Sequence, residues 1–276
     1  MADFDVSDLE NMANKLRLHV VEMTHEAGSG HPGGSLSAAD MIAALYFKFM
    51  NHDPSNPSWE DRDRFVLSKG HVAPVLYAAL AESGYFPVED LLSLRKMGSK
   101  LQGHPVRGKV PGVEMSTGSL GQGLSMACGI ALAGKMDGRD YKTICMLGDG
   151  ELQEGQNWEA AMFARQAGLS NLIAIVDRNR LQITGDTESA VGLEPLPEKW
   201  KSFGWNVIII DGHNMSQILE ALDMAAASES RPTVIIMRTV KGKGVSFMEN
   251  NADFHGKACN DEELAQAVGE LRAVIR

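Results

Sequence analysis

The sequence predicts an α/β protein of three layers (αβα), in which helices cover both faces of a mainly parallel central sheet. Four short runs are almost continuously apolar, as strands buried on both faces are; they are residues 143–147, 172–177, 207–211 and 233–238. Segments with helical periodicity separate most of these runs, which favours strand–helix–strand units. Three runs end at or near an aspartate, and ligands of such sheets bind beyond the carboxyl ends of the strands. The aspartates are Asp149, Asp177 and Asp211.

The elements follow in order along the chain. Residues 6–27 are predicted to be a helix because Leu9, Leu16 and Val20 recur at helical spacing. A second helix is predicted over 37–50, with Ser37 and Asp40 as its N-terminal capping pattern. Gly and Pro recur in 95–118, which predicts a long loop. The other predicted helices are 73–83, 121–133 (rich in small residues), 154–167, 216–227 and 260–275. We expect residues 1–276 to form one domain with an N-terminal helical segment.

Composition limits the possible functions. The 276 residues carry a formal net charge of -10 and are 44% hydrophobic, which argues against a nucleic-acid-binding protein. We expect no secretory signal and no membrane span, because the N-terminus is acidic and apolar runs are short. The cysteines are odd in number and far apart, so we expect reduced packing residues and a cytoplasmic protein. They are Cys128, Cys145 and Cys259.

The sequence ICMLGDGELQEG places a carboxylate directly after an apolar run. Asp149 lies between Gly148 and Gly150, which allow a sharp turn and close approach of an anion. Asn179 follows 30 residues later, about the length of one crossover, so the two side chains can meet at neighbouring strand ends. Together they predict a cation held against a phosphate. Alternatively, Asp149 caps a helix and Asn179 makes a turn.

Four of the eight histidines lie beside glycine in segments predicted to be loops. They are His31, His71, His104 and His255. Imidazole exchanges protons near neutral pH and binds hydroxyls, so this set predicts a pocket for a hydroxylated substrate. A structural role is the alternative for each one. The other four, predicted to be helix-surface or turn residues outside any site, are His19, His25, His52 and His213.

Several motifs resemble a known family. The spacing of Gly148-Asp149-Gly150 and Asn179 is similar to the thiamine-diphosphate motif. SGHPG, SKGH, STGSLGQG and FHG resemble, in the same order, the signatures of the N-terminal half of transketolase. VKGKGVSFMENN looks most like the short, split-gene transketolases, whose two halves are separate chains. The resemblance covers almost the whole sequence and implies the thiamine-diphosphate-binding fold, in its diphosphate-binding (PP-type) form.

The resemblance implies a binding role for individual residues. A divalent cation, Mg²⁺ with Ca²⁺ or Mn²⁺ as alternatives, would be held by Asp149, Asn179 and the carbonyl of Leu181. Contacts to thiamine diphosphate are implied for His71, Gly118, Ser119, Leu120, Gly150, Asn179 and His255. Whether Arg180 adds charge near the diphosphate or faces solvent stays open.

Catalytic roles are also implied by the resemblance. The residues concerned are His31, His71, His104, His255 and Glu154. His31 and His255 would line the substrate channel, and His104 would reach the reacting hydroxyls. Glu154 would lie near a subunit interface, where the family couples its two sites through carboxylates.

The implied function is transfer of a two-carbon ketol unit from a ketose phosphate to an aldose phosphate. The resemblance implies that a second, pyrimidine-binding chain supplies the activating glutamate, in a heterotetramer with two copies of each half. The predicted interface includes Thr117 to Gly123 and the helix near Glu154, with Met115, Met126 and Met162 as contacts or, equally, as core. Alternatives are a deoxyxylulose-phosphate-synthase-like or 2-oxo-acid-dehydrogenase-like subunit, or a non-catalytic homologue. The sequence does not identify the two sugars.

Overall fold

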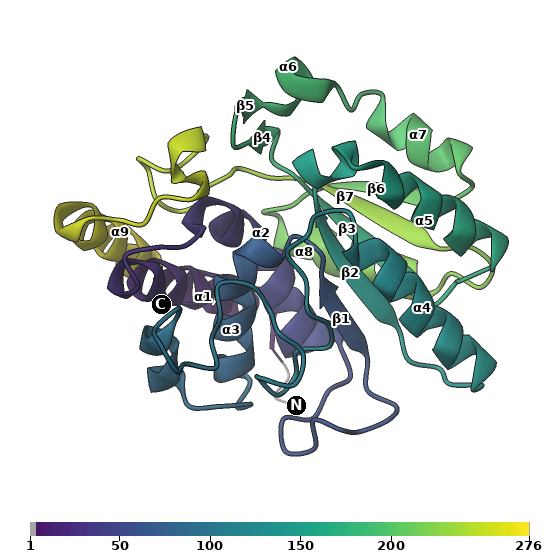
Figure 1. The fold of residues 1–276 in the computed structure, drawn as a ribbon, viewed down its shortest axis with the longest axis horizontal. Helices are drawn as coiled ribbons and strands as arrows, with labels where there is room; N and C mark the ends of the chain where they lie inside the picture. The colour runs from purple at the N-terminus through teal and green to yellow at the C-terminus, as the bar shows by residue number, and fades with distance from the viewer. Residues whose placement is uncertain (1–3, 276) are drawn as a thin grey trace.

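The computed structural model describes residues 4–275 and centres on one parallel sheet (Figure 1). Its strand order is β1-β2-β3-β7-β6, and all four pairings are parallel. The strands are β1 (Arg64–Leu67), β2 (Thr143–Gly148), β3 (Leu172–Arg178), β6 (Asn206–Asp211) and β7 (Thr233–Arg238). The four apolar runs are therefore strands as predicted, and β1 is an additional strand at one edge.

Helices cover both faces of the sheet, which confirms the predicted three-layer fold. One face packs against α1 (Val6–Glu26), α2 (Pro32–Ala44), α3 (Ala73–Glu82) and α8 (Met215–Ala226). The opposite face packs against α4 (Gly123–Met136), α5 (Gly155–Gln166) and α7 (Leu196–Ser202). The last helix, α9 (Asp261–Val274), packs on α1.

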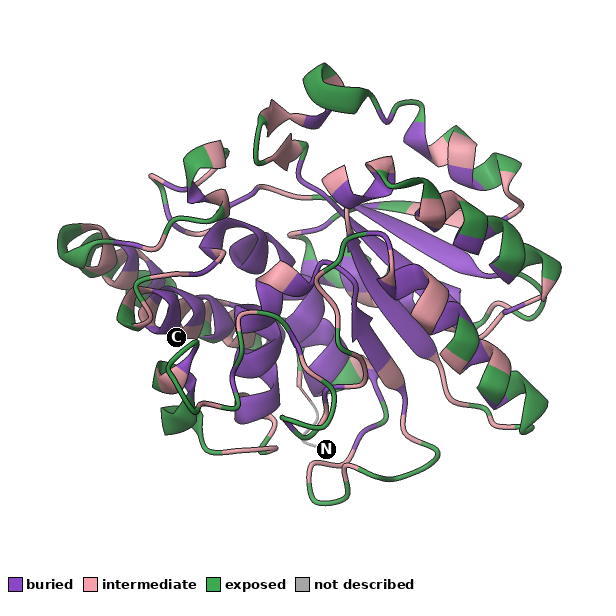
Figure 2. Cartoon of the chain, viewed as in Figure 1, coloured by how far each residue is buried: buried purple, intermediate pink, exposed green. Residues whose placement is uncertain are grey.

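Alternation along the strands divides the core into two parts, because successive side chains of a strand point to opposite faces. In β2, Ile144 and Met146 join the core under α1 to α3, whereas Cys145 and Leu147 join the core under α4 and α5. Strand β3 is buried throughout, and β2 is buried up to Leu147 (Figure 2). Cys145 and the other two cysteines are buried free thiols, as expected for packing residues.

The start of α2 was predicted wrongly. The helix begins at Pro32, whose fixed φ suits a first helical position, rather than at Ser37. Ser37 is buried inside the helix, where its hydroxyl donates to Asp177 Oδ2 at 2.6 Å. Asp40 is equally buried and binds Arg17. Both residues therefore hold neighbouring elements together instead of capping a helix.

All four histidines predicted to lie outside any cluster have specific partners. His213 Nδ1 lies 2.7 Å from Asp40 and so joins the buried pair of Asp40 and Arg17. His52 is buried, with Nε2 2.7 Å from the carbonyl of Tyr46. His19 Nε2 lies 2.6 Å from Glu82. His25 Nδ1 lies 2.9 Å from the carbonyl of Cys259. The prediction was wrong for His52, which is buried, and the contacts of His19, His25 and His213 connect segments distant in the sequence.

Two small elements follow β3 and end near the site. A hairpin consists of β4 (Leu181–Gln182) and β5 (Gly185–Asp186), and α6 (Thr187–Val191) follows it directly. Residues 95–118 form the predicted loop, which Thr117 fixes by donating its hydroxyl to the carbonyl of Leu67 at 2.6 Å. Within residues 4–275, no helix has the length and apolar character that crossing a membrane requires.

Candidate active site

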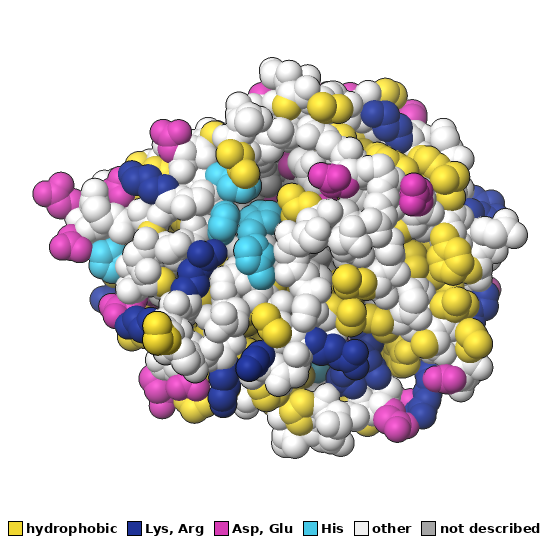
Figure 3. Space-filling view, viewed as in Figure 1, with side chains coloured by type: hydrophobic (Ala, Val, Ile, Leu, Met, Phe, Trp, Pro, Cys, Tyr) yellow, Lys and Arg dark blue, Asp and Glu magenta, His cyan; other side chains and the backbone are white. Residues whose placement is uncertain are grey.

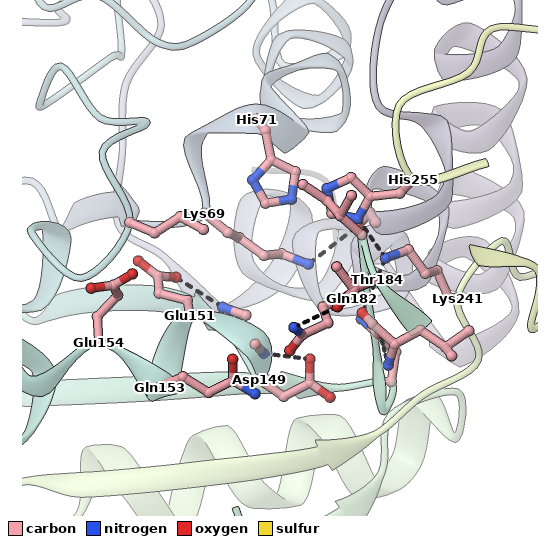
Figure 4. A pocket seen from close by; sticks show the side chains of 17 residues that line it. Lys69, His71, Asp149, Glu151, Gln153, Glu154, Gln182, Thr184, Lys241 and His255 are labelled. Atoms are coloured by element: carbon pink, nitrogen blue, oxygen red, sulfur yellow. Dashed lines mark hydrogen bonds between the residues drawn. The ribbon is translucent and has the colours of Figure 1, made fainter. Parts of the chain in front are cut away.

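A cavity of about 340 Å³ lies beyond the carboxyl ends of four neighbouring strands (Figure 4). Each strand leads to one polar residue of its wall. Lys69 follows β1, Asp149 follows β2, Asn179 follows β3 and Lys241 follows β7. This is the edge at which parallel sheets bind ligands. The structure therefore brings the predicted pair of Asp149 and Asn179 into one site.

The carboxylate of Asp149 is buried and held in place by the surrounding chain. Oδ1 accepts from the backbone N–H of Gly150 at 2.8 Å, and Oδ2 accepts from that of Arg180 at 2.5 Å. Oδ2 also lies 3.1 Å from the guanidinium of Arg178. Burial and the nearby charge of Asp177 raise the pKa of Asp149, while these donors favour its ionised form. A bound cation would favour the ionised form further.

Two more oxygens belong to residues that line the same cavity. Asn179 Oδ1 accepts from the backbone N–H of Leu181 at 3.0 Å, and the Leu181 carbonyl accepts from Lys241 Nζ at 3.1 Å. Among residues 4–275, no three His, Cys, Asp or Glu side chains are arranged to hold a metal ion. A cation here would therefore depend on amide, backbone and ligand oxygens, which suit hard ions such as Mg²⁺.

The four histidines predicted to share a pocket are grouped around His31. Its ring centroid lies 5.2 Å from that of His71, 5.5 Å from that of His255 and 6.4 Å from that of His104. Figure 3 shows histidine side chains together beside a recess of the surface. His71 and His255 line the cavity itself, whereas His31 and His104 are not among its lining residues; His104 is exposed.

These imidazoles are neutral at pH 7. Burial and neighbouring positive charges lower the pKa of His31 to about 4 and that of His255 to about 3. The same effects hold the pKa of His71 well below its usual range and lower that of His104. A neutral imidazole has one donor and one acceptor, so each ring can relay a proton or bind a hydroxyl.

Two lysines in the cavity were missed by the sequence reasoning. Lys69 is 2% exposed and forms an ion pair with Asp177, which is fully buried. Lys241 Nζ lies 2.8 Å from His255 Nδ1, and burial beside Lys69 lowers the pKa of Lys241 to about 8. Both side chains reach toward the cavity in Figure 4. The available signal was a lysine beside glycine, in SKGH and VKGK.

The glycine-rich segment Thr117 to Gly123 packs tightly against the end of β1. A Cβ on Gly70 would lie 2.7 Å from the backbone of Thr117 and Gly118, so a larger residue would displace this segment. Gly118, with a φ of 140°, lies against the His104 ring. Leu120 lines the cavity, whereas Ser119 is exposed outside it. This close packing places the segment beside the histidines.

Two glutamates near this segment differ in role. Glu151 is buried, and its carboxylate accepts from the backbone N–H groups of Gly121 and Gly148 at 3.0 Å each. It therefore fixes the segment against β2, a role that the sequence did not suggest. Glu154 is exposed on the cavity wall, next to Gly121.

Arg180 faces solvent, which settles the question left open by the sequence. Its side chain is exposed and its backbone adopts a φ of 65°. Such a left-handed conformation is uncommon outside glycine. It lets the Arg180 N–H point at Asp149. The main chain of Arg180, and not its charge, is what contacts the site.

The fold and the site together define a class of protein: an α/β protein with a polar ligand-binding cavity at the carboxyl edge of its parallel sheet. The family model described as "Transketolase, thiamine diphosphate binding domain" matches residues 9–272. The chain therefore belongs to the transketolase family, of which it is the thiamine-diphosphate-binding portion.

Similar proteins include two of nearly equal length. The chain is 48% identical to the 6-deoxy-6-sulfo-D-fructose transketolase subunit SqwG of Clostridium sp. strain MSTE9, over 96% of each chain. It is 44% identical to an apulose-4-phosphate transketolase subunit of Phocaeicola vulgatus, over 96% of this chain and 94% of that one. These matches confirm the prediction of a transketolase subunit, which is an enzyme of the transferase class.

Solved transketolases share the fold but are longer. The enzyme of Campylobacter jejuni matches with a TM-score of 0.90 at 36% identity, covering 96% of this chain and 42% of that chain. A Pichia stipitis transketolase in complex with sedoheptulose 7-phosphate matches with a TM-score of 0.89 at 32% identity, covering 98% and 44%. The chain thus spans less than half the length of these enzymes.

Proposed function

We propose that this chain binds the diphosphate of thiamine diphosphate and, with a partner chain, transfers a two-carbon ketol unit from a ketose phosphate to an aldose phosphate. The observation that carries the proposal is one cavity whose lining combines the Asp149 carboxylate and the Asn179 amide with two lysines and two histidines. Thiamine diphosphate supplies the carbanion that cleaves the ketose and stabilises the two-carbon fragment. The protein binds the cofactor and transfers protons to and from the substrate hydroxyls.

The residues present fit a diphosphate with its cation. The Asp149 carboxylate, the Asn179 amide oxygen and the Leu181 carbonyl would hold Mg²⁺, with Ca²⁺ or Mn²⁺ as substitutes. Lys241 and the backbone at Gly150 would bind phosphate oxygens, and Lys241 would exchange its contact with Leu181 for one with phosphate. Two buried polar atoms near the cavity, Gln182 Oε1 and His31 Nδ1, have no hydrogen-bond partner among residues 4–275. A bound polar ligand would satisfy such atoms.

The histidines are proposed to act on the sugar and the cofactor. His31 and His255 would line the channel beside the diphosphate, His104 would bind substrate hydroxyls, and His71 would contact the cofactor. Because all four rings are neutral, each can accept a proton from one hydroxyl or donate one to another. The Leu120 wall and the backbone of Gly118 and Ser119 would complete the cofactor site.

We propose that the donor substrate is a ketose that carries an anionic group at one end. One relative is named for a sulfonated ketose and the other for a phosphorylated one. A donor scan would compare ketose phosphates, a sulfonated ketose and pyruvate. Transfer from ketoses and none from pyruvate supports the proposal. Use of pyruvate alone would support the 2-oxo-acid alternative instead.

The assembly is proposed from the same comparisons. Both relatives of similar length are named as subunits, and the longer transketolases contain additional chain beyond this domain. We propose a heterotetramer with two copies of each half, Glu154 near the subunit interface, and residues 1–276 as a single domain. Buried free thiols suit the reducing cytoplasm, where we place the enzyme.

Replacing Asp149 by alanine tests the cation site. The variant loses one oxygen ligand and leaves the diphosphate charge poorly neutralised, so we expect cofactor affinity to fall at least about tenfold, or about 1.4 kcal/mol. Calorimetry of thiamine diphosphate binding to the assembled enzyme, at several Mg²⁺ concentrations, measures the change. Chelating the divalent cation should reproduce the loss in the unmodified enzyme.

Asp211→Ala is the matched control for this experiment. Asp211 also ends a strand, but it lies outside the cavity and accepts from the backbone of His213. Its replacement should leave cofactor affinity unchanged. Equal affinity of the Asp149→Ala and unmodified enzymes at limiting Mg²⁺ would exclude the assignment of this carboxylate to the cation.

Alanine replacements of the four histidines test the proposed division of roles. His31→Ala, His104→Ala and His255→Ala should lower turnover or sugar affinity more than cofactor affinity, by about 10²-fold or more where proton transfer is lost. His71→Ala should weaken cofactor binding as well. Steady-state kinetics and cofactor titration distinguish the two effects. His19→Ala, which changes only the pair with Glu82, is the control; normal kinetics in all four site variants would show that these rings are structural.

A further inference from the structure

We infer that Arg178 is a positioning residue that couples the carboxylate of Asp149 to the segment of residues 186–194. This inference rests on the proposed cation site and concerns a residue that is not itself a proposed ligand. Arg178 is the last residue of β3 and directly precedes Asn179. Its side chain is only 5% exposed, although it carries a full charge. Such a charge needs several partners to be retained in a folded protein.

The guanidinium has partners on both sides. Nη1 donates to Asp149 Oδ2 at 3.1 Å and to Thr187 Oγ1 at 2.7 Å. Nη2 donates to Glu188 Oε1 at 2.7 Å and to Glu194 Oε1 at 3.0 Å. One planar group therefore connects the strand-end carboxylate to three residues of the segment. Lysine, with a single ammonium, cannot reproduce this fork of donors.

Strand alternation explains why Arg178 can do this while its neighbour cannot. Asp177 points to the face covered by α2, where it meets Ser37 and Lys69. Arg178 points to the opposite face, toward Asp149 and the segment that follows the hairpin. Two adjacent charged residues thus serve two separate networks on the two faces of the sheet.

The segment has few other means of staying ordered. Most of residues 186–194 are exposed or half-buried; only Thr187 and Leu193 are buried. Glu188 closes the segment on itself by accepting from the backbone of Leu193 and Glu194. Segments with so few buried apolar contacts open easily. Their order then depends on the polar contacts that remain. Gln153 Nε2 donates to the carbonyls of Thr187 and Val191, and the charged contacts of the segment converge on Arg178.

The segment matters because it supports one wall of the cavity. Gln182, Ile183 and Thr184, at the tip of the hairpin just before it, line the site. Glu188 and Glu194 balance the charge of Arg178, so the guanidinium orients Asp149 without adding net positive charge against a bound cation. Partners that hydrogen-bond a ligating carboxylate typically change metal affinity by about 10–100-fold. Arg178 would thereby fix the Asp149 carboxylate relative to the hairpin residues that line the cavity.

Hydrogen exchange on the full chain without cofactor tests the coupling directly. Arg178→Gln should accelerate backbone exchange of residues 186–194 about tenfold or more, with β2 and β7 unchanged. Asp149→Asn should accelerate the same residues about fivefold, a typical coupling. When Arg178→Gln is already present, adding Asp149→Asn should not accelerate the exchange of these residues further. Arg178→Lys keeps the charge and should still loosen the segment. Arg139→Gln, which changes only exposed pairs with Glu60 and Asp61, is the control.

The Mg²⁺ concentration needed for half-maximal thiamine diphosphate binding is the second readout. It should rise about tenfold or more in Arg178→Gln. If that variant does not fold, Glu188→Gln/Glu194→Gln leaves Arg178 on Asp149 and should still raise the requirement about fivefold. The inference is overturned if residues 186–194 exchange at the wild-type rate in every Arg178 variant. It is also overturned if Asp149→Asn still accelerates their exchange when Arg178 has been replaced. If the unmodified protein binds no cofactor at any Mg²⁺ concentration, the proposed function fails, and the exchange experiment still decides the coupling.

Discussion

Replacing Asp177 by alanine is expected to lower the free energy of unfolding by about 3–5 kcal/mol, because it leaves a buried lysine charge without its partner. The Asp177 side chain is fully buried, and Lys69 is 2% exposed. The same carboxylate accepts from Ser37 Oγ at 2.6 Å and from Thr239 Oγ1. One substitution therefore removes an ion pair and leaves several donors unpaired.

Urea-induced unfolding of the purified chain, followed by circular dichroism, measures this loss. The double variant Lys69→Met/Asp177→Leu removes both charges and should be much closer to the unmodified protein. Glu26→Ala is the surface control, since its pair with Lys96 is half exposed and surface ion pairs contribute little to stability. An Asp177→Ala protein as stable as the surface control would contradict a structural role for the buried pair.

The pH dependence of this contribution has a definite sign. Burial alone would raise the pKa of Asp177, but Lys69, Ser37 and Thr239 more than offset it, so the folded-state pKa lies below the ordinary value of 3.8. The folded protein then binds fewer protons than the unfolded chain. The stabilisation is fully present above about pH 4 and is lost as the pH falls through the folded-state pKa.

Much of the fold and part of the site could be predicted because they depend on local signals. Buried parallel strands are nearly continuous in apolar residues, so 172–177 and 233–238 are recognisable from composition. The spacing of Asp149 and Asn179 equals one crossover, and two adjacent parallel strands place such residues side by side. Glycines beside histidines marked the four rings that group around His31, two of which line the cavity.

Other features could not be predicted because they depend on which elements become neighbours. The edge strand β1 contains only Arg64–Leu67 and follows a charged stretch, so its apolar signal is too short. Lys69 and Asp177 are 108 residues apart, and their pairing follows from the order of strands in the sheet. Arg178 resembles an ordinary charged residue at a strand end until the segment 186–194 folds over it. Ser37 is a residue type typical of helix caps, and its actual partner, Asp177, lies too far away in the sequence to be recognised as one.

The largest functional effect is expected from the purified chain alone, which should show no two-carbon transfer even with saturating thiamine diphosphate and Mg²⁺. In the proposed function this chain anchors the diphosphate, and a partner chain supplies the pyrimidine pocket and the glutamate that activates the cofactor. The cavity wall agrees with that division. The carboxylates of Asp149 and Glu151 accept hydrogen bonds from backbone N–H groups, so neither is available to activate the cofactor. Glu154 is exposed on the wall, free to face a partner.

The surface proposed to receive the partner lies beside this wall. Met162 and Phe163 on α5 are 53% and 47% exposed, and Leu120 is 37% exposed at the cavity. Of the other methionines predicted to lie there, Met126 on α4 is half-buried, and Met115 packs against the core. Exposed apolar side chains in such a group mark a binding surface. An obligate interface here would bury more than about 2,000 Å².

Adding the partner chain should restore transfer at a ratio near one to one, with the two chains eluting together as a heterotetramer. Met162→Lys/Phe163→Lys on α5 should weaken assembly while leaving the isolated chain folded, because both side chains are already exposed. Met224→Lys on α8, 57% exposed on the opposite face of the sheet, is the matched control and should assemble normally. Ketol transfer by the rigorously purified single chain would refute the division of the site between two polypeptides, and the activating carboxylate would then have to be sought within these 276 residues.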